Sequence, residues 1–275
     1  ASDVYKRQPI KTEEIELNNL FSLKGKTAVV TGGSSGIGAM IAESFVRNGV
    51  KTYITSRKEE ILQNTAREFS KFGECIAISA DLSETEGILK FIKEIKAVEG
   101  KIDILINNAG TSWGAPIEEF PEQGWDKVMD INLKSIFFLT QKCIPLLKLA
   151  GNRDTPARVV NIASINGITH PNMPTYSYSS SKAAVIQLTR HMGADLAKEF
   201  INVNGIAPGY FPSKMTAFMG RDAKMQKMVI NKIPLGRIGK PDDIAGAVIY
   251  LCSSASSWIC GQTIVVDGGM VAGAG

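Results

Sequence analysis

Residues 31–38 read TGGSSGIG, a glycine-rich stretch that follows the short apolar run Thr27–Val30 and leads into the amphipathic stretch Ile37–Asn48. A glycine turn between a strand and a helix lets backbone N–H groups and the helix dipole face a pyrophosphate, because a Cβ at the close positions would collide with it. Alone, such a turn could equally be a tight connection. In the first strand–turn–helix unit of a chain it predicts a dinucleotide site.

The same order of strand and helix repeats from residue 26 to the end of the chain. Short runs rich in Val and Ile are typical of parallel strands that are buried on both faces. Seven such strands are predicted: Thr27–Val30, Thr52–Thr55, Ile76–Ser79, Ile102–Ile106, Arg158–Ile162, Asn202–Ile206 and Thr263–Val266. Apolar residues at three- and four-residue spacing predict the helices between them: Ile37–Asn48, Glu59–Lys71, Glu84–Glu99, Trp125–Leu149, Tyr178–Phe200 and Pro241–Ser253. This alternation predicts an α/β fold with a doubly wound sheet.

The length of the chain favours a single domain. Area scaling for 275 residues predicts that about 70% of the extended chain's surface is buried on folding. We expect residues 1–22 to form a flexible N-terminal extension and residues 23–275 to form the domain. Residues 207–239 contain Pro208, Pro212 and Pro234 and no clear element. Because loops this long are usually functional, residues 208–239 are predicted to be a substrate lid.

Composition and charge exclude several classes of protein. The 31 Lys and Arg against 27 Asp and Glu leave a net charge of +4, too small to indicate a nucleic-acid surface. No apolar stretch approaches the roughly 20 residues that span a bilayer, and the N-terminal residues do not resemble a secretory signal. The four cysteines share no Cys-x-x-Cys spacing, so buried free thiols and a cytoplasmic location are expected. Neither histidine, His170 or His191, has a metal-type partner, and no metal site is predicted.

The end of the second predicted strand reads Ser56-Arg57-Lys58. An acidic residue at this point would accept hydrogen bonds from the ribose hydroxyls of NAD, and none is present. A guanidinium instead attracts a 2′-phosphate, by up to about 4 kcal/mol at 4 Å and an effective dielectric constant of 20. The sequence therefore favours NADP over NAD, although Arg57 and Lys58 could also be ordinary solvated residues.

Two tyrosines have a lysine four residues later, Tyr178 with Lys182 and Tyr210 with Lys214. A free tyrosine has a pKa of about 10 and is a poor acid or base near pH 7, whereas a neighbouring ammonium lowers that pKa. Pro208 and Pro212 bar a regular helix through the second pair. Only Tyr178 and Lys182 are therefore expected to share one helix face.

Together with these residues, several motifs stand in order at the ends of the predicted elements, and the chain from about Leu23 to Gly269 resembles the short-chain dehydrogenase/reductase family. The motifs are Thr31–Gly38, Asn107-Asn108-Ala109-Gly110, Ser164, Tyr178 with Lys182, Pro208-Gly209, and Val266-Asp267-Gly268-Gly269. The resemblance implies a single Rossmann domain whose seven-stranded parallel sheet carries helices on both faces.

The resemblance also implies roles for individual residues. The catalytic residues would be Asn132, which holds a water, Ser164, which polarises the substrate carbonyl, Tyr178, which donates or takes the proton, and Lys182, which binds the nicotinamide ribose and lowers the tyrosine pKa. The residues that bind NADP(H) would be Gly32, Ser34, Ser35, Gly36, Ile37, Gly38, Ser56, Arg57, Lys58, Asp81, Leu82, Asn107, Ala109, Gly110, Tyr178, Lys182, Pro208, Gly209, Phe211 and Ser213. Because Ser35 stands where many NADP-using relatives have Arg or Lys, the 2′-phosphate would rest on Arg57 and nearby hydroxyls.

Within the family, residues 108–115, Gly124-Trp125 and the doubled tyrosine Tyr176-Ser177-Tyr178 look most like NADPH-dependent 3-oxoacyl reductases of the rhamnolipid-associated type. This likeness implies reduction of a 3-oxoacyl thioester by a homotetramer. An alcohol or polyol dehydrogenase of the same family and a non-catalytic NADP-binding regulator are the alternatives. Four apolar residues either line an acyl pocket or only pack: Trp113, Met215, Phe218 and Met219.

Overall fold

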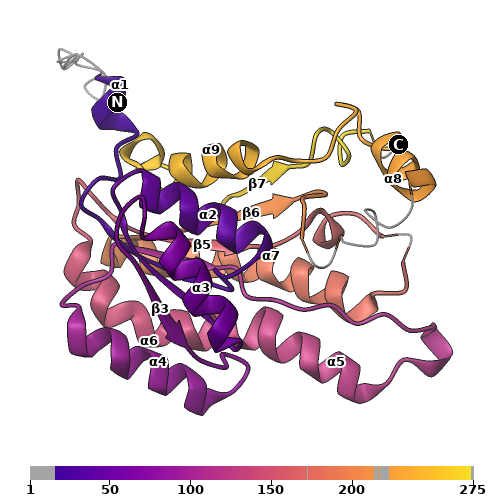
Figure 1. The fold of residues 1–275 in the computed structure, drawn as a ribbon, viewed down its shortest axis with the longest axis horizontal. Helices are drawn as coiled ribbons and strands as arrows, with labels where there is room; N and C mark the ends of the chain where they lie inside the picture. Colours follow the sequence, from indigo (N-terminus) through magenta and orange to yellow (C-terminus); the bar gives the residue numbers. More distant parts are fainter. Residues whose placement is uncertain (1–15, 172, 214–215, 217–222, 274–275) are drawn as a thin grey trace, which may run out of the picture.

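Seven parallel strands form one sheet at the centre of the computed structural model, which describes residues 16–171, 173–213, 216 and 223–273 (Figure 1). The strands are β1 (Thr27–Thr31), β2 (Lys51–Ser56), β3 (Cys75–Ser79), β4 (Ile104–Asn107), β5 (Ala157–Ile162), β6 (Ile201–Pro208) and β7 (Thr263–Val266). Their order across the sheet is β3-β2-β1-β4-β5-β6-β7. The order in which successive strands are added to the sheet therefore reverses between β1 and β4. A parallel sheet opens a crevice at the carboxyl ends of its strands at such a point.

Helices cover both faces of the sheet, which confirms the predicted doubly wound fold. The helices are α1 (Leu17–Leu20), α2 (Gly36–Arg47), α3 (Glu59–Phe69), α4 (Thr85–Val98), α5 (Glu122–Met129), α6 (Ser135–Ala150), α7 (Tyr176–Leu196), α8 (Ala223–Ile230) and α9 (Pro241–Cys252). Helices α2, α3 and α9 pack on one face, where Phe45 is fully buried, and α4, α6 and α7 pack on the other around Phe91. Both layers bury the apolar runs of the central strands β1, β4, β5 and β6, whereas the edge strand β7 is only partly buried.

One predicted helix contains a turn of a different kind. The helix predicted over Trp125–Leu149 is confirmed, but a π-helical turn at Asp130–Lys134 separates its two α-helical parts, α5 and α6. Its apolar spacing continues through the turn, so periodicity alone gave no sign of the break. The turn carries Asn132 into the interior, where the side chain is fully buried. Single π-helical turns of this kind occur frequently at functional sites.

The predicted ends of other elements also shift. Helix α7 begins at Tyr176, and a 3₁₀ turn over Ala197–Glu199 follows its end at Leu196. Helix α8 lies within residues 208–239, where no element was predicted, and its Ala, Lys, Met and Gln residues are good helix formers. Within the expected N-terminal extension, Leu17–Leu20 forms one helical turn. The expectations for Lys214, Met215, Phe218 and Met219 fall outside the described residues.

Three observations concern the described part of the chain only. None of its helices is long and apolar enough to cross a membrane. No group of three His, Cys, Asp or Glu side chains within it could hold a metal ion. The four cysteines are free thiols; Cys75, Cys143 and Cys252 are buried, as the sequence predicts, whereas Cys260 is only partly buried.

Two helical glycines provide a test of how closely α2 packs against the glycine-rich turn. A Cβ on Gly38 would collide with the carbonyl oxygen of Gly32 and the side-chain amide of Asn108, whereas a Cβ on Gly246, in α9, would meet no atom within 4 Å. We predict that Gly38→Ala lowers the free energy of unfolding by about 1–3 kcal/mol through overpacking. Gly246→Ala should raise it by up to about 1 kcal/mol through helix propensity. Urea denaturation measures both, and equal effects of the two substitutions would contradict this packing.

Candidate active site

A crevice runs across the carboxyl ends of β1, β2 and β4, at the point where the strand order reverses. It consists of two adjoining cavities of about 230 and 350 Å³. Five residues line both cavities: Gly32, Ser35, Ala109, Gly110 and Thr111. We call this pair of cavities the cofactor crevice, because its position and its extended shape match those of a dinucleotide site in a doubly wound sheet.

The glycine-rich turn forms the floor of the cofactor crevice between β1 and α2. Gly32 and Gly36 have φ angles of +65° and +57°, which only glycine adopts without strain. A Cβ on Gly36 would also approach the Cβ of Ser213 to 3.1 Å. The turn therefore leaves room for a ligand at the N-terminus of α2, where free N–H groups favour an anion. Gly38, predicted to bind the cofactor, does not line the crevice and instead allows α2 to pack closely against the turn.

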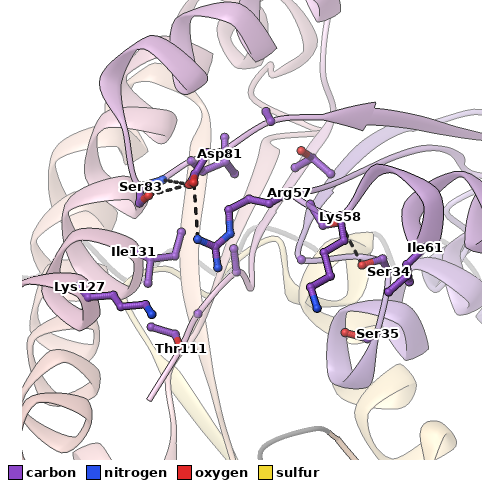
Figure 2. A pocket seen from close by; sticks show the side chains of 17 residues that line it. Ser34, Ser35, Arg57, Lys58, Ile61, Asp81, Ser83, Thr111, Lys127 and Ile131 are labelled. Carbon is purple, nitrogen blue, oxygen red and sulfur yellow. Dashed lines mark hydrogen bonds and ion pairs between the residues drawn. The ribbon is translucent and has the colours of Figure 1, made fainter. Parts of the chain in front are cut away.

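The cavity of about 230 Å³ holds the positive charges that the sequence predicts (Figure 2). Arg57 and Lys58 enter it from the end of β2, and the Arg57 guanidinium lies 3.5 Å from the Asp81 carboxylate. The Ser34 hydroxyl donates a hydrogen bond to the Ser56 hydroxyl at 3.1 Å. Lys127, which the sequence analysis did not select, reaches the opposite wall from α5. A phosphate with a charge of −2 would meet three cationic side chains in this cavity.

Asp81 is held in its charged form. Its carboxylate accepts hydrogen bonds from the Ser83 amide at 3.0 Å and from the Ser83 hydroxyl at 2.6 Å. Partial burial raises the pKa of Asp81, but the Ser83 hydrogen bonds and the charge of Arg57 outweigh it and lower the pKa overall. The carboxylate therefore pairs with the exposed Arg57 guanidinium at the edge of the cavity. Leu82, buried beside it, completes this wall.

Asn107 and Asn108 have different roles from those expected. Asn107 does not line the crevice, because its side chain points into the interior, where it donates hydrogen bonds to Thr140 at 3.0 Å and Asn161 at 2.8 Å. Asn108 lines the crevice instead and donates to the carbonyl oxygen of Thr31 at 2.8 Å. The Thr31 hydroxyl in turn accepts from the backbone amides of Asn108 and Ala109, both at 2.9 Å. These bonds join the ends of β1 and β4.

Asn132 connects three parts of the site from inside the protein. Its side-chain oxygen accepts a hydrogen bond from the Thr111 amide at 2.8 Å. Its side-chain nitrogen donates to the Thr111 carbonyl and to the Ser181 hydroxyl, both at 3.0 Å. Ser181 lies between Tyr178 and Lys182 along the chain, and its hydroxyl donates to the Tyr178 carbonyl at 2.7 Å. The π-helical turn is thereby fastened to the loop after β4 and to α7.

Ser164, Tyr178 and Lys182 meet at the far end of the cofactor crevice. Ser164 follows β5 directly and caps a 3₁₀ turn at Ile165–Gly167, accepting a hydrogen bond from the Asn166 amide. Its hydroxyl is also hydrogen-bonded with the Tyr178 hydroxyl. The amine of Lys182 lies 5.7 Å from the centre of the Tyr178 ring and donates to the Ile162 carbonyl at 2.7 Å. A carbonyl compound in this corner would face two hydroxyl donors.

Burial shifts the pKa values of both Tyr178 and Lys182. It raises the pKa of Tyr178, and the hydrogen bond with Ser164 offsets only part of that rise. It lowers the pKa of Lys182 to about 8, because the amine has little access to water. The sequence predicts that Lys182 lowers the pKa of Tyr178, yet the net shift in this structure is upward. Desolvation therefore decides the net direction of the pKa shift and favours the neutral form of Tyr178 near neutral pH.

A further cavity of about 450 Å³ opens beside Ser164 and Tyr178, and we call it the substrate cavity. Its walls include residues that the sequence does not single out, among them Ser112, Ile165, Asn166, Met173, Thr175 and Thr216. They come from the loops after β4, β5 and β6, which have no periodic signal. Trp113 is not among them, because its indole packs where a Cβ of Gly124 would lie, which supports the packing alternative.

The end of β6 and the segment that follows it form a wall of both the cofactor crevice and the substrate cavity. Pro208, Gly209, Phe211 and Ser213 line the cofactor crevice, and Tyr210 lines the substrate cavity. The Gly209 amide donates to the Val266 carbonyl at 2.9 Å, which ties this segment to β7. Lys214, the alternative partner of Tyr210, lies outside the described residues.

Comparison with known proteins places this geometry in a family. The family model described as enoyl-(acyl carrier protein) reductase matches residues 32–271. A rhamnolipids biosynthesis 3-oxoacyl-(acyl-carrier-protein) reductase of Pseudomonas aeruginosa is 43% identical over 249 residues, which cover 90% of this chain and 97% of the relative. A 2-dehydro-3-deoxy-D-gluconate 5-dehydrogenase of Dickeya dadantii is 38% identical over 263 residues, which cover 92% of this chain and 98% of the relative.

A solved structure agrees with these matches. The RhlG/NADP active-site complex of Pseudomonas aeruginosa superposes with a TM-score of 0.90 at 42% sequence identity. The match covers 92% of this chain and 99% of that one. The glycine-rich turn, the crevice at the reversal of strand order and the Ser164, Tyr178 and Lys182 corner are thus found in a chain that belongs to the short-chain dehydrogenase/reductase family of oxidoreductases.

Proposed function

We propose that this protein is an NADP(H)-dependent reductase that converts a 3-oxoacyl thioester to the 3-hydroxyacyl thioester. The observation that carries this proposal is the substrate cavity, where none of the described lining residues is a lysine or an arginine. A sugar-acid carboxylate would find no cationic partner among them. A neutral acyl thioester needs none, and its ketone would meet the hydroxyls of Ser164 and Tyr178.

NADP(H) as the cofactor is supported by the charges in the cofactor crevice. Arg57, Lys58 and Lys127 surround the cavity of about 230 Å³, and the end of β2 carries no carboxylate that would repel a 2′-phosphate. Ser34 and Ser35 add hydroxyl donors there. The superposed structure from Pseudomonas aeruginosa is a complex with NADP. Bound in the crevice, the reduced nicotinamide supplies the hydride for the reaction.

The residues at the end of the crevice would handle the carbonyl oxygen and the proton. The Ser164 hydroxyl donates a hydrogen bond to the ketone oxygen and polarises the carbonyl. The Tyr178 hydroxyl gives its proton to the same oxygen as the carbon receives a hydride, so the ketone becomes a secondary alcohol. The upward shift of the pKa of Tyr178 keeps that proton available at neutral pH. Tyr178 must afterwards be reprotonated from solvent.

Lys182 and Asn132 would support this step without giving up the proton themselves. The Lys182 amine, anchored on the Ile162 carbonyl, faces the cofactor crevice and would bind the nicotinamide ribose. Asn132 holds Thr111 through both its backbone amide and its carbonyl. This keeps the loop after β4 in place between the cofactor crevice and the substrate cavity, both of which Thr111 lines.

We also propose a lid and an oligomer. Residues 208–239, which include α8, begin at the wall of the substrate cavity and would close over it. Helices α5 and α6 expose large apolar side chains, including Trp125 and the edge-to-face pair Phe137 and Phe138, whose ring centres are 5.2 Å apart. Apolar surface of this kind supports assembly into a homotetramer through this helical face.

One panel of candidate substrates distinguishes the proposed function from two alternatives. A dehydrogenase of sugar acids or polyols is favoured by the relative from Dickeya dadantii, and a silent NADP-binding regulator would share the cofactor crevice. NADPH oxidation should be measured at 340 nm with 3-oxoacyl thioesters, keto sugar acids and simple ketones. The proposal requires the thioesters to give the highest kcat/KM. A higher value for a keto sugar acid would select the first alternative, and no oxidation with any ketone would select the second.

The preference for NADPH over NADH tests whether the positive charges in the cofactor crevice bind the 2′-phosphate. NADPH should bind at least about tenfold more tightly than NADH, a difference of about 1.4 kcal/mol. The substitution Arg57→Asp should remove this preference, because the new carboxylate repels the 2′-phosphate while NADH lacks that group. Fluorescence titration measures both dissociation constants. Arg67→Asp, an equal change of charge on the outer part of α3, is the control and should leave the preference intact. An unchanged preference in Arg57→Asp would contradict the assignment.

The proton donor is tested by removing one hydroxyl. Tyr178→Phe should lower kcat by about 10²- to 10⁴-fold, the usual contribution of general acid catalysis, and leave NADPH affinity unchanged. Tyr176→Phe is the matched control, because Tyr176 lies two residues earlier on α7 and its ring packs against Phe120 outside the crevice. Turnover that survives in Tyr178→Phe would show that another group donates the proton.

A further inference from the structure

Tyr210 lies between two cavities. It lines the substrate cavity on one side, together with Ser164 and Tyr178. On its other side lies a cavity of about 350 Å³ beneath the end of β7, which we call the rear cavity. Tyr210 is the residue that lines both of them. Among the described residues, Tyr210 is therefore the point where the two cavities adjoin.

The backbone on both sides of Tyr210 is fixed. The Gly209 amide donates to the Val266 carbonyl at 2.9 Å, and the Tyr210 carbonyl accepts from the Gly239 amide at 2.9 Å. The ring of the next residue, Phe211, is fully buried and fills the space that a side chain on Gly239 would need. Tyr210 itself is about half-buried, with its backbone held at both neighbouring peptides. The main chain that carries the Tyr210 ring is therefore held in place between the two cavities.

The rear cavity suits an apolar chain. Its walls include Phe211, Ile233, Leu235, Val265 and Val266. The charged side chains at its edge already have partners: Arg237 binds the Asp243 carboxylate through two nitrogens at 2.6 and 2.9 Å, and Asp267 accepts from the Gly269 and Val271 amides. Entry of an alkyl chain would therefore leave none of these charges without a partner.

We propose that the Tyr210 ring sets the longest acyl chain that the enzyme accepts, by closing the substrate cavity against the rear cavity. This inference rests on the proposed function and assigns the two directions of the substrate. The polar side chains of Ser112, Asn166 and Thr175 fit the thioester arm. The acyl tail runs toward Tyr210 and stops against its ring, and without the ring the tail continues into the rear cavity.

A series of 3-oxoacyl N-acetylcysteamine thioesters from four to fourteen carbons tests this wall. Calorimetry would measure their binding to the wild-type enzyme with NADP⁺, and kcat/KM would be measured with NADPH. Each methylene that becomes buried should tighten binding about fourfold, until the tail reaches Tyr210 and the gain stops. In Tyr210→Ala the gain should continue for at least two more methylenes, so the longest chains bind more than about tenfold better than to the wild type.

Two variants control the interpretation. Tyr210→Phe keeps the ring, so its gain should stop at the same chain length as in the wild type. Tyr210→Ala combined with Val265→Phe refills the rear cavity from β7 and should abolish the extra gain. NADPH affinity, measured for every variant, reports whether the fold and the cofactor crevice are intact.

Three results would overturn the inference. In the first, the affinity of Tyr210→Ala stops rising at the same chain length as that of the wild type. In the second, the additional affinity for long chains persists in the double variant, and in the third, Tyr210→Phe shows the same dependence on chain length as Tyr210→Ala. Failure of the proposed function looks different, because the thioesters would then not be reduced while the binding series still reports on the wall. A wild type that binds no thioester of any length would contradict both.

Discussion

The hydrogen bond from the Lys182 amine to the Ile162 carbonyl holds the two halves of the site together. Burying an amine costs free energy, and the lowered pKa of Lys182, about 8, reflects that cost. The bond ties α7 to the last residue of β5, two residues before Ser164. Because Tyr178 lies one helical turn before Lys182, this anchor also brings its hydroxyl to Ser164. A buried, partly desolvated cation is thus a condition for the geometry that the proposed chemistry needs.

Buried polar side chains extend this anchoring through the layers. Asn107 donates to Thr140 and Asn161, and Asn161 donates to Thr189 on α7, so β4, β5, α6 and α7 are joined inside the protein. Asn132 joins the π-helical turn to α7 and to the loop after β4. In a low dielectric such hydrogen bonds are strong, and leaving one partner without the other is costly. The loops around the crevice are therefore positioned by the core.

The sheet and the principal residues could be predicted from the sequence because their signals are local. Val- and Ile-rich runs, the glycine-rich turn and the Tyr178–Lys182 spacing each depend on a few neighbouring residues. Other features depend on tertiary contacts. The π-helical turn at Asn132 leaves the apolar spacing unbroken, and whether Asn107 or Asn108 faces the crevice depends on where β4 ends. The net direction of the Tyr178 pKa shift depends on burial, and the position of Tyr210 between two cavities arises only in the folded chain.

That burial keeps Tyr178 protonated is tested most directly by tyrosinate absorbance. The pH titration of the wild type at 295 nm, minus that of Tyr178→Phe, isolates the ionisation of this one phenol. Because the neutral form is favoured in the fold, the difference signal should appear above the ordinary tyrosine pKa of about 10. A difference signal that rises between pH 6 and about 9 would contradict this, because Tyr178 would then be a preformed tyrosinate stabilised by Lys182.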